Sequence, residues 1–402
     1  MRPGADPLLQ RPDPVGRAAR VPGGGAHAAR RPLRVTTGAL VNRIAVLGTG
    51  LVGGSVGLAA RARGIHVTGY DRAPERGARA LERRAVDGLA DDVAGAVADA
   101  DLVVVAVPVG LAAEVAIAAL DAGAGLVTDV GSVKAVVVES VEAQRPGAAA
   151  RFVGGHPMAG SEQDGLDGAD ADLFVGATWV LTPTPTTDPA AFEAVRDFAV
   201  ALEAEVIAVS PRHHDALVAV VSHVPQLAAT TLMDVAARRG EEHATLLRLA
   251  AGGFRDMTRI AASHPAIWPD ICVANRDAIV ASLDHYLVAL AEVRELVAGA
   301  DRTALLELLE RARAARRNLP VGTPSGAALV ELRIPVPDRP GVLAEVTTAA
   351  GVLGVNIVDL EIAHSGEGTG GVLVLVVPEA SVSVFEAALT ERGYHHSRRV
   401  LA

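Results

Sequence analysis

A glycine-rich loop between a short apolar run and a helix of small residues constrains this sequence most strongly. The run Arg43-Ile-Ala-Val-Leu leads into Gly48-Thr-Gly50-Leu-Val-Gly53, and small residues continue to Arg63. After a strand, the first glycine permits a tight turn, the second lets the backbone approach a pyrophosphate, and the third permits close helix packing. The pattern predicts a dinucleotide-binding parallel sheet, with the anion at the helix N-terminus.

An acidic residue about twenty positions after the loop indicates which dinucleotide binds. Asp71 ends the second apolar run, where its carboxylate can bind ribose hydroxyls and repel a 2′-phosphate, so NAD is expected. Arg72 leaves NADP open, because a guanidinium can pair with a 2′-phosphate. Alternatively, the glycines are ordinary turn residues and Asp71 is a helix cap. The expected cofactor contacts are Gly48, Gly50, Leu51, Val52, Gly53, Asp71 and Val107.

Hydrophobic periodicity divides the chain into four parts. Residues 1–40 have no apolar period and are expected to be a disordered tail, or translation from a start placed too far upstream. Alternating strands and helices predict a Rossmann-type α/β domain with a parallel sheet over 41–185, ending near a Thr/Pro loop at 183–189. Long apolar stripes predict an all-helical second domain over 186–320. After a linker at 319–326, residues 328–402 predict a small α+β module of βαββα order.

Composition narrows the class of protein. The single cysteine, Cys272, excludes an intrachain disulfide and a cysteine zinc cluster, so no metal site and a cytoplasmic location are expected. The net charge of -10 disfavours nucleic-acid binding. No uninterrupted apolar stretch reaches the roughly 18 residues of a membrane helix, so no membrane contact is expected. The apolar helical stripes are expected to be buried in a homodimer.

Two polar segments follow predicted strands. Asp129-Val-Gly-Ser132-Val-Lys134 lies at the carboxyl end of the predicted strand 125–129, where ligands of open α/β sheets bind. Further on, glycines flank His156 in the segment that continues to Ser161 and Glu162, so its imidazole can approach a substrate. The alternative is a loop histidine that is satisfied by its neighbours.

Two further segments carry polar side chains into the helical region. The segment from His214 to Gln226 includes His223, and positions 215, 219, 222 and 226 share one face of a regular helix. Polar groups on that face need partners or a ligand, unless they are helix caps and surface positions. In Phe254-Arg-Asp-Met-Thr-Arg259, guanidiniums could capture a carboxylate, although an isolated arginine is more often a solvated surface residue.

In this order, the segments resemble the prephenate/arrogenate dehydrogenase family from residue 42 onward. The resemblance implies an NAD-dependent oxidative decarboxylation of a cyclohexadienol, in a cleft between a nucleotide-binding domain and a helical dimerisation domain. It implies that His156 accepts the proton of the C4 hydroxyl, that Ser132 orients this hydroxyl, and that Arg259 binds a substrate carboxylate. The remaining substrate-pocket residues that it implies are Ser161, Glu162, His223 and Gln226. Because only neutral imidazole can act as this base, an acid limb near pH 6.5 is expected, roughly the reference pKa of histidine.

One position bears on the substrate. Many prephenate-using members of the family have a second histidine where this chain has Gln226. We expect a prephenate dehydrogenase that forms 4-hydroxyphenylpyruvate. The alternative is an arrogenate dehydrogenase that forms tyrosine, because a neutral amide could accommodate an amino group.

The last module resembles the ACT domains, which bind amino acids between paired copies. The resemblance rests on Val336-Pro-Asp338-Arg-Pro340-Gly341-Val-Leu343 and on Gly354-Val-Asn356-Ile357. It implies tyrosine as a feedback effector. The alternative is an oligomerisation module without a ligand, because such a pattern fixes a fold better than a ligand.

Two other functions compete with this interpretation. Dehydrogenases of the β-hydroxyacid type usually rely on a lysine in their helical domain, but residues 135–402 contain no lysine. A non-catalytic NAD and amino-acid sensor predicts loss of the catalytic set, yet Ser132, His156 and Arg259 are all present. An oxidoreductase remains the favoured class.

Overall fold

The computed structural model describes the chain from residue 41 to residue 401 with gaps. The described residues are 41–161, 163, 165–242, 249–317, 329–337, 339–364 and 370–401. The predicted tail 1–40, the predicted linker 319–326 and the substrate-pocket candidate Glu162 lie outside these residues. Asp338 of the C-terminal motif also lies outside them.

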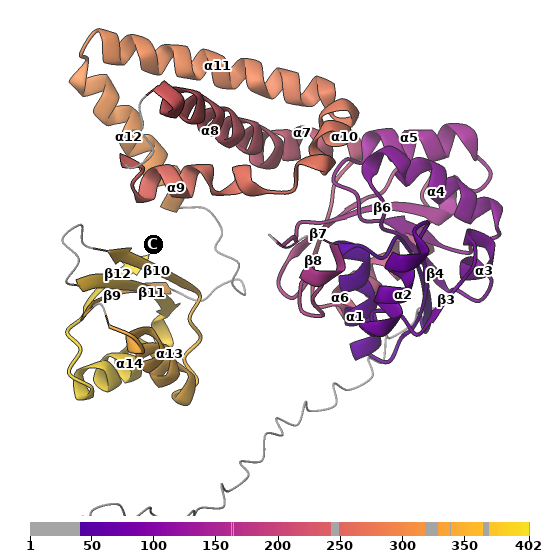
Figure 1. Ribbon diagram of the computed structural model, residues 1–402, viewed down its shortest axis with the longest axis horizontal. Coiled ribbons are helices and arrows are strands. Elements are labelled where there is room, and N and C mark those ends of the chain that lie inside the picture. Colours follow the sequence, from indigo (N-terminus) through magenta and orange to yellow (C-terminus); the bar gives the residue numbers. More distant parts are fainter. Residues whose placement is uncertain are drawn as a thin grey trace, which may run out of the picture.

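Eight strands form the sheet of the first part of the chain (Figure 1). They are β1 (Arg43–Leu47), β2 (His66–Tyr70), β3 (Gly88–Leu89), β4 (Leu102–Val105), β5 (Val127–Asp129), β6 (Phe152–Pro157), β7 (Thr178–Thr182) and β8 (Glu205–Ala208). Their order is β3-β2-β1-β4-β5-β6-β7-β8, and β3 to β6 are parallel. The order of these six strands is that of the Rossmann fold, whose ligands bind where the order reverses, here between β1 and β4. The Rossmann-type prediction is confirmed.

The edge of this sheet differs from the prediction. Strand β7 runs antiparallel to β6, so the sheet is not wholly parallel. The Thr/Pro loop at 183–189 does not end the sheet, because it leads into helix α6 (Pro189–Ala201) and then into β8, which pairs with β7. The predicted domain boundary at residue 185 therefore falls inside this sheet. Proline and threonine marked an exposed loop correctly, but an exposed loop need not separate domains.

Helices cover both faces of the sheet and bury its central strand (Figure 1). They are α1 (Leu51–Ala62), α2 (Pro74–Glu82), α3 (Val93–Val97), α4 (Val109–Asp121), α5 (Ala135–Gln144) and α6. Side chains alternate along β1: Ile44 and Val46 pack into the cluster that includes α1 and α6, whereas Ala45 and Leu47 pack into the cluster that includes α4 and α5. Burial on both faces explains why β1 is a continuous apolar run.

The described residues 211–242 and 249–317 are mainly helical, which confirms the predicted helical domain, although it begins at residue 211 and not at 186. The helices are α7 (Pro211–Val218), α8 (Val224–Glu242), α9 (Gly252–Thr258), α10 (Trp268–Ala274), α11 (Arg276–Ala298) and α12 (Arg302–Arg317). Helix α11 lies along α7 and α8, and α10 packs against α4 of the first part (Figure 1). The contact between α10 and α4 brings the helical part against the carboxyl edge of the sheet.

A π-helical turn interrupts the helix that carries the polar segment. It spans Ala219–His223, between α7 and α8. The extra residue of a π turn changes which side chains face inward. His223 is buried while Ser222 is only half-buried, so the predicted face of positions 215, 219, 222 and 226 is wrong at 222.

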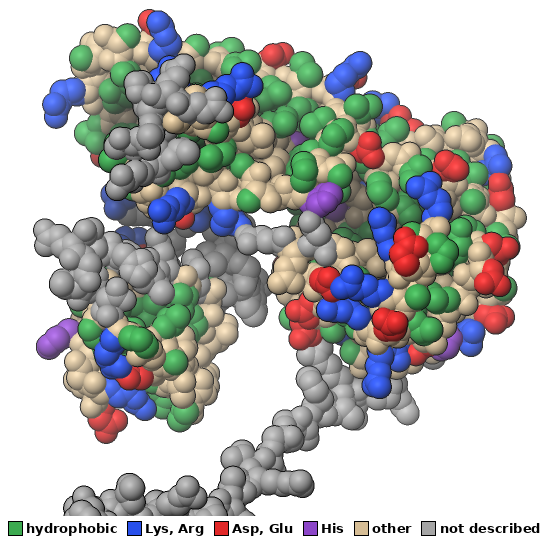
Figure 2. All heavy atoms as spheres, viewed as in Figure 1, with side chains coloured by type: hydrophobic (Ala, Val, Ile, Leu, Met, Phe, Trp, Pro, Cys, Tyr) green, Lys and Arg blue, Asp and Glu red, His purple; other side chains and the backbone are tan. Residues whose placement is uncertain are grey.

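The helical part exposes many apolar side chains (Figure 2). Val221 on the π turn is 66% exposed, Leu287 on α11 is 60% exposed, and Leu309 on α12 is 65% exposed. The helix Pro211–Gly240 is long and apolar enough to cross a membrane by length and composition, with 33% of its most apolar window buried. It also carries the buried polar residues His214, Asp215, His223 and Gln226, whose partners are described below. An exposed apolar face of this size is typical of an interaction surface.

The C-terminal part has six elements in βαββαβ order. They are β9 (Leu329–Pro337), α13 (Val342–Val352), β10 (Asp359–His364), β11 (Gly370–Pro378), α14 (Glu379–Glu391) and β12 (Ser397–Leu401). The strands form an antiparallel sheet of order β10-β11-β9-β12, and both helices pack on one face (Figure 1). The prediction of five elements missed β12. Its residues, Ser-Arg-Arg-Val-Leu, form an edge strand with little apolar periodicity.

Candidate functional site

The glycine loop between β1 and α1 leaves little space at two of its glycines and open space at the third. Gly48 has a φ of +98°, in the left-handed region, and a side chain there would clash with the carbonyl of Ala106. A side chain at Gly53 would clash with the carbonyl of Gly48, whereas nothing lies within 4 Å of a Cβ at Gly50. The loop can therefore admit an anion at Gly50 and at the N-terminus of α1, as a dinucleotide pyrophosphate requires.

Asp71 is held next to this loop. One of its carboxylate oxygens accepts the backbone N–H of Thr49 at 2.9 Å and the Thr49 hydroxyl at 3.1 Å. Its other oxygen accepts the backbone N–H of Ala73 at 2.9 Å. The half-buried acid is thus fixed at the carboxyl end of β2, while the neighbouring Arg72 is exposed. Leu51 and Val52 lie half-buried in the first turn of α1, and Val107 lies half-buried just beyond β4.

His156, on β6, begins a chain of hydrogen bonds that crosses to α7. Its Nδ1 lies 2.9 Å from Nε2 of His214, and Nδ1 of His214 lies 2.8 Å from an oxygen of Asp215. His156 is half-buried, whereas His214 and Asp215 are 1% and 4% exposed. His214 and Asp215 lie in the predicted polar segment 214–226, but no role was predicted for them from the sequence. The sequence feature that could have indicated a role was the position of two adjacent polar residues at the start of an apolar helix.

The carboxylate of Asp215 also caps helix α5. Its two oxygens accept the backbone N–H groups of Lys134 and Ala135, each at 2.8 Å. A carboxylate at a helix N-terminus satisfies free N–H groups and is stabilised by the helix dipole. Asp215 of the helical part therefore hydrogen-bonds to the Rossmann-type part while it also contacts His214.

A buried ion pair lies below His156. Lys134, the only lysine among the 402 residues, is completely buried and donates to Asp129, which is also completely buried. The ammonium also donates to the carbonyl of Gly155 at 2.8 Å, and the backbone N–H of Gly155 donates to Asp129 at 3.1 Å. The backbone carbonyl and N–H of Gly155, the residue before His156, are thus both held by the Lys134–Asp129 pair.

His223 lies within the same buried polar cluster. Its Nδ1 lies 3.2 Å from Nδ2 of Asn275, and this amide also donates to the backbone carbonyl of Asp215 at 2.8 Å. The indole of Trp268 packs edge-on against His223, with ring centroids 6.1 Å apart. Gln226 is buried too, and its Nε2 lies 3.5 Å from the Thr230 hydroxyl.

The other predicted site residues lie on three different segments of the chain. Ser132 is half-buried between β5 and α5, on the same carboxyl edge of the sheet as Val107 and Asp129. Ser161 is exposed on the loop after β6, where its hydroxyl accepts the backbone N–H of Gln163 at 3.1 Å. Arg259 begins a short 3-10 helix, Arg259–Ala262, that packs against α8, and it is exposed.

Comparison with known proteins identifies the family of this chain. Residues 56–208 match "Prephenate dehydrogenase, nucleotide-binding domain", and residues 210–311 match "Prephenate dehydrogenase, dimerization domain". A prephenate dehydrogenase from Bacillus subtilis is 34% identical over 337 residues, 82% of this chain and 90% of the relative. The chain belongs to the prephenate dehydrogenase family.

Solved structures agree with this family assignment. Prephenate dehydrogenase from A. aeolicus, in complex with hydroxyphenyl propionate and NAD+, is 29% identical with a TM-score of 0.65. The match covers 72% of this chain and all of that structure. Synechocystis arogenate dehydrogenase is 31% identical with a TM-score of 0.60, covering 68% of this chain and 98% of that structure. The two family matches meet near residue 209, after β8, which agrees with the extent of the observed sheet.

Burial lowers the pKa of both His156 and His223 in this member of the prephenate dehydrogenase family. Desolvation lowers the pKa of His156 well below 6.5, and the nearby His214, Lys134 and His223 lower it further. Desolvation also lowers the pKa of His223 to about 4, against the opposing effect of Asp215. From the sequence, the reference pKa of about 6.5 was expected at His156, but in the fold the pKa of this imidazole lies well below it.

Proposed function

We propose that this chain is a prephenate dehydrogenase that converts prephenate to 4-hydroxyphenylpyruvate with NAD as the oxidant. The proposal rests chiefly on His156, which is kept neutral by burial and lies on β6 near the carboxyl edge of a Rossmann-type sheet. A neutral imidazole in this position can accept a proton from a substrate hydroxyl beside a bound nicotinamide. The match to prephenate dehydrogenases over most of the chain supports the reaction class.

Each proposed role follows from the chemistry of the side chain. Bound NAD supplies the acceptor for the hydride that leaves C4 of the substrate ring. His156 accepts the C4 hydroxyl proton at Nε2, because its Nδ1 is engaged with His214. Ser132 orients the hydroxyl, and Arg259 binds a substrate carboxylate. The ring carboxylate leaves as carbon dioxide, and its bonding electrons complete the aromatic ring.

The choice between prephenate and arrogenate rests on Gln226. Its buried amide can donate to a keto oxygen or accept from an ammonium, so both substrates remain chemically possible. The relatives likewise include an arogenate dehydrogenase. We favour prephenate because relatives from Bacillus subtilis and Lactococcus lactis, 34% and 31% identical to this chain, are prephenate dehydrogenases.

A direct assay tests the proposed reaction. Purified protein is mixed with NAD and either prephenate or arrogenate, and NADH is followed by absorbance while the product is identified by chromatography. The expected result is NADH formation with 4-hydroxyphenylpyruvate as the main product. If arrogenate is converted to tyrosine with a higher kcat/KM than prephenate, the substrate assignment changes to arrogenate. If neither compound yields NADH, the proposed function is rejected.

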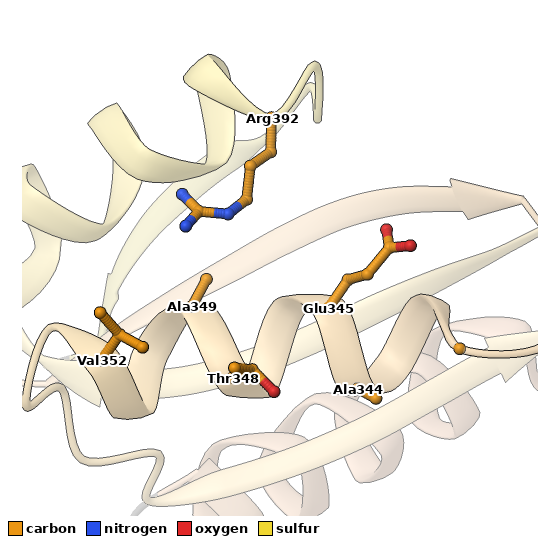
Figure 3. Close-up of a pocket in the computed structure, with 7 residues that line it drawn as sticks. Ala344, Glu345, Thr348, Ala349, Val352 and Arg392 are labelled. Atoms are coloured by element: carbon orange, nitrogen blue, oxygen red, sulfur yellow. The ribbon is translucent and has the colours of Figure 1, made fainter. Parts of the chain in front are cut away.

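The C-terminal part is proposed to be an ACT-like domain that binds an amino-acid effector, with tyrosine as the first candidate. Its βαββαβ order is that of ferredoxin-like domains, the group to which ACT domains belong. A groove of about 650 Å³ lies between α13 and α14. Arg392, at the end of α14, and Glu345, on α13, give this groove opposite charges above the apolar Ala349 and Val352 (Figure 3). A carboxylate, an ammonium and a side chain could each find a complementary surface there.

The helical part is proposed to form a homodimer in the cytoplasm. Its exposed apolar residues surround a cavity of about 530 Å³ lined by residues of the π turn, α8, α9 and α11, among them Val220, Met257 and Tyr286. A second copy would bury this apolar surface, and the matched dimerisation domain supports this arrangement. Light scattering of the purified chain should give twice the monomer mass, and a monomer at micromolar concentration would reject the dimer.

A further inference from the structure

The hydrogen bonds around His214 fix the position of each proton in the chain from Asp215 to His156. The Asp215 carboxylate accepts two backbone N–H groups at the start of α5, so it acts as an acceptor toward His214 as well. Nδ1 of His214 must then carry its proton, and Nε2 of the neutral ring is an acceptor. Nδ1 of His156 must therefore donate to it, which leaves the lone pair of His156 at Nε2.

We propose that His214 and Asp215 form a proton relay behind His156, a role that rests on the proposed function of His156 as the base. The substrate O–H bond breaks as a proton binds Nε2 of His156. The Nδ1–H bond of His156 breaks in turn as that proton binds Nε2 of His214. His214 becomes an imidazolium that still donates Nδ1–H to the Asp215 carboxylate. Hydride transfer and decarboxylation are unchanged, so the relay needs no additional reactant.

The charges around the two imidazoles favour this direction of transfer. A positive charge on His156 is disfavoured by burial and by Lys134 and His223. A positive charge on His214 lies 2.8 Å from a carboxylate, whose attraction is strong in a buried setting. An imidazolium at His214 would therefore be paired with a carboxylate, as in other enzymes where a carboxylate stabilises a histidine cation.

The proton returns to the substrate oxygen at the end of the reaction. Loss of the hydride and of carbon dioxide leaves the ring oxygen as a phenolate, so the proton on Nε2 of His214 passes back to Nδ1 of His156 as Nε2 of His156 gives its proton to this oxygen. The reaction therefore releases no net proton, and Asp215 stays a carboxylate throughout. His214 and Asp215 thus act through His156 as positioning residues that fix its tautomer and hold the proton during hydride transfer.

The variant His214→Gln separates proton transfer from simple orientation. The glutamine carbonyl can still accept Nδ1–H of His156, but it cannot accept the proton. We expect the single-turnover rate of NADH formation to fall at least 100-fold, with the KM for substrate and the Kd for NAD within threefold of wild type. His213→Gln is the matched control, because His213 is the exposed neighbour on the same helix, and it should retain the wild-type rate.

Solvent isotope measurements on the unaltered enzyme provide a test that does not depend on how a variant folds. The single-turnover rate is measured in mixtures of H2O and D2O. A relay moves two protons, so the rate should curve downward with the deuterium fraction, whereas transfer to His156 alone gives a straight line. A straight line, or His214→Gln within threefold of wild type, would overturn the relay. The variant His156→Asn separates failure of the relay from failure of the base assignment. If this variant is inactive, His156 remains the proposed base. If it is active, both the base assignment and the relay are rejected.

Discussion

The carboxylate of Asp215 accepts the backbone N–H of Lys134 at 2.8 Å. This contact joins the helical part of the chain to the first turn of α5. Lys134 in turn holds the Gly155 carbonyl through its ammonium, while Asp215 holds His214. His156 is therefore fixed from its backbone side and from its imidazole side by two residues that contact each other. A change at either residue should affect the geometry of the candidate base.

Replacing His156 with Asn should lower kcat by about 10² to 10⁴, because the amide cannot accept the substrate proton. The Kd for NAD should stay nearly the same, since the glycine loop and Asp71 are untouched. In the wild type, activity should persist as pH falls through 6.5, because burial keeps the pKa of His156 below that value. Initial rates across pH 4 to 8 and fluorescence titration with NADH measure both effects. His213→Asn is the control, and a fully active His156→Asn would remove this residue from the mechanism.

Replacing Asp71 with Asn should weaken the preference for NAD over NADP by about 10- to 100-fold in kcat/KM, because the carboxylate no longer repels a 2′-phosphate. The asparagine oxygen can still accept from Thr49, so the loop should keep its shape. Asp91→Asn, an exposed acid on the same part of the chain, serves as the matched control. Unchanged discrimination in Asp71→Asn would show that another group selects the ribose.

Replacing Lys134 with Met should destabilise the fold by about 3 to 5 kcal/mol, because Asp129 would remain as a buried charge without its partner. The double variant Lys134→Met with Asp129→Asn removes both charges and should recover part of that loss. Urea unfolding of the three proteins, followed by circular dichroism, gives the comparison. If Lys134→Met is as stable as the wild type, the ion pair does not support the fold. Arg276→Met is the control, because it removes an exposed cation.

The steric roles that the sequence predicted for Gly48 and Gly53 are seen in the fold, because a side chain at Gly48 would clash with Ala106 and one at Gly53 would clash with Gly48. The His156–His214 contact could not be predicted, since it joins β6 to α7 across 58 positions of the chain. The π turn at 219–223 also escaped prediction, because a regular helical period assumes a constant number of residues per turn. Strand β12 was missed because its pairing with β9 depends on a partner distant in sequence.

Replacing Gln226 with His should raise the ratio of kcat/KM for prephenate over arrogenate by about tenfold, the effect of roughly one hydrogen bond to a substrate group. A histidine can donate to the keto oxygen of prephenate and, when protonated, repels the ammonium of arrogenate. Gln144→His places the same residue at an exposed site near the end of α5 and should not change the ratio. An unchanged ratio in Gln226→His would show that this position does not read the side chain of the substrate.

Replacing Arg392 with Gln should raise the tyrosine concentration for half-maximal inhibition by about tenfold or more, because the groove between α13 and α14 would lose its cation for a carboxylate. Uninhibited activity should not change, since Arg392 lies in the C-terminal part, away from the candidate base.

Arg398→Gln is the matched control, as Arg398 is exposed on β12 and pairs with Glu386 outside the groove. Glu345 is a poorer choice for mutation, because its bonds to Arg339 and Tyr394 support the domain itself. Equal tyrosine sensitivity in Arg392→Gln and wild type would place any effector elsewhere, and a wild type insensitive to tyrosine would favour a module that only mediates oligomerisation.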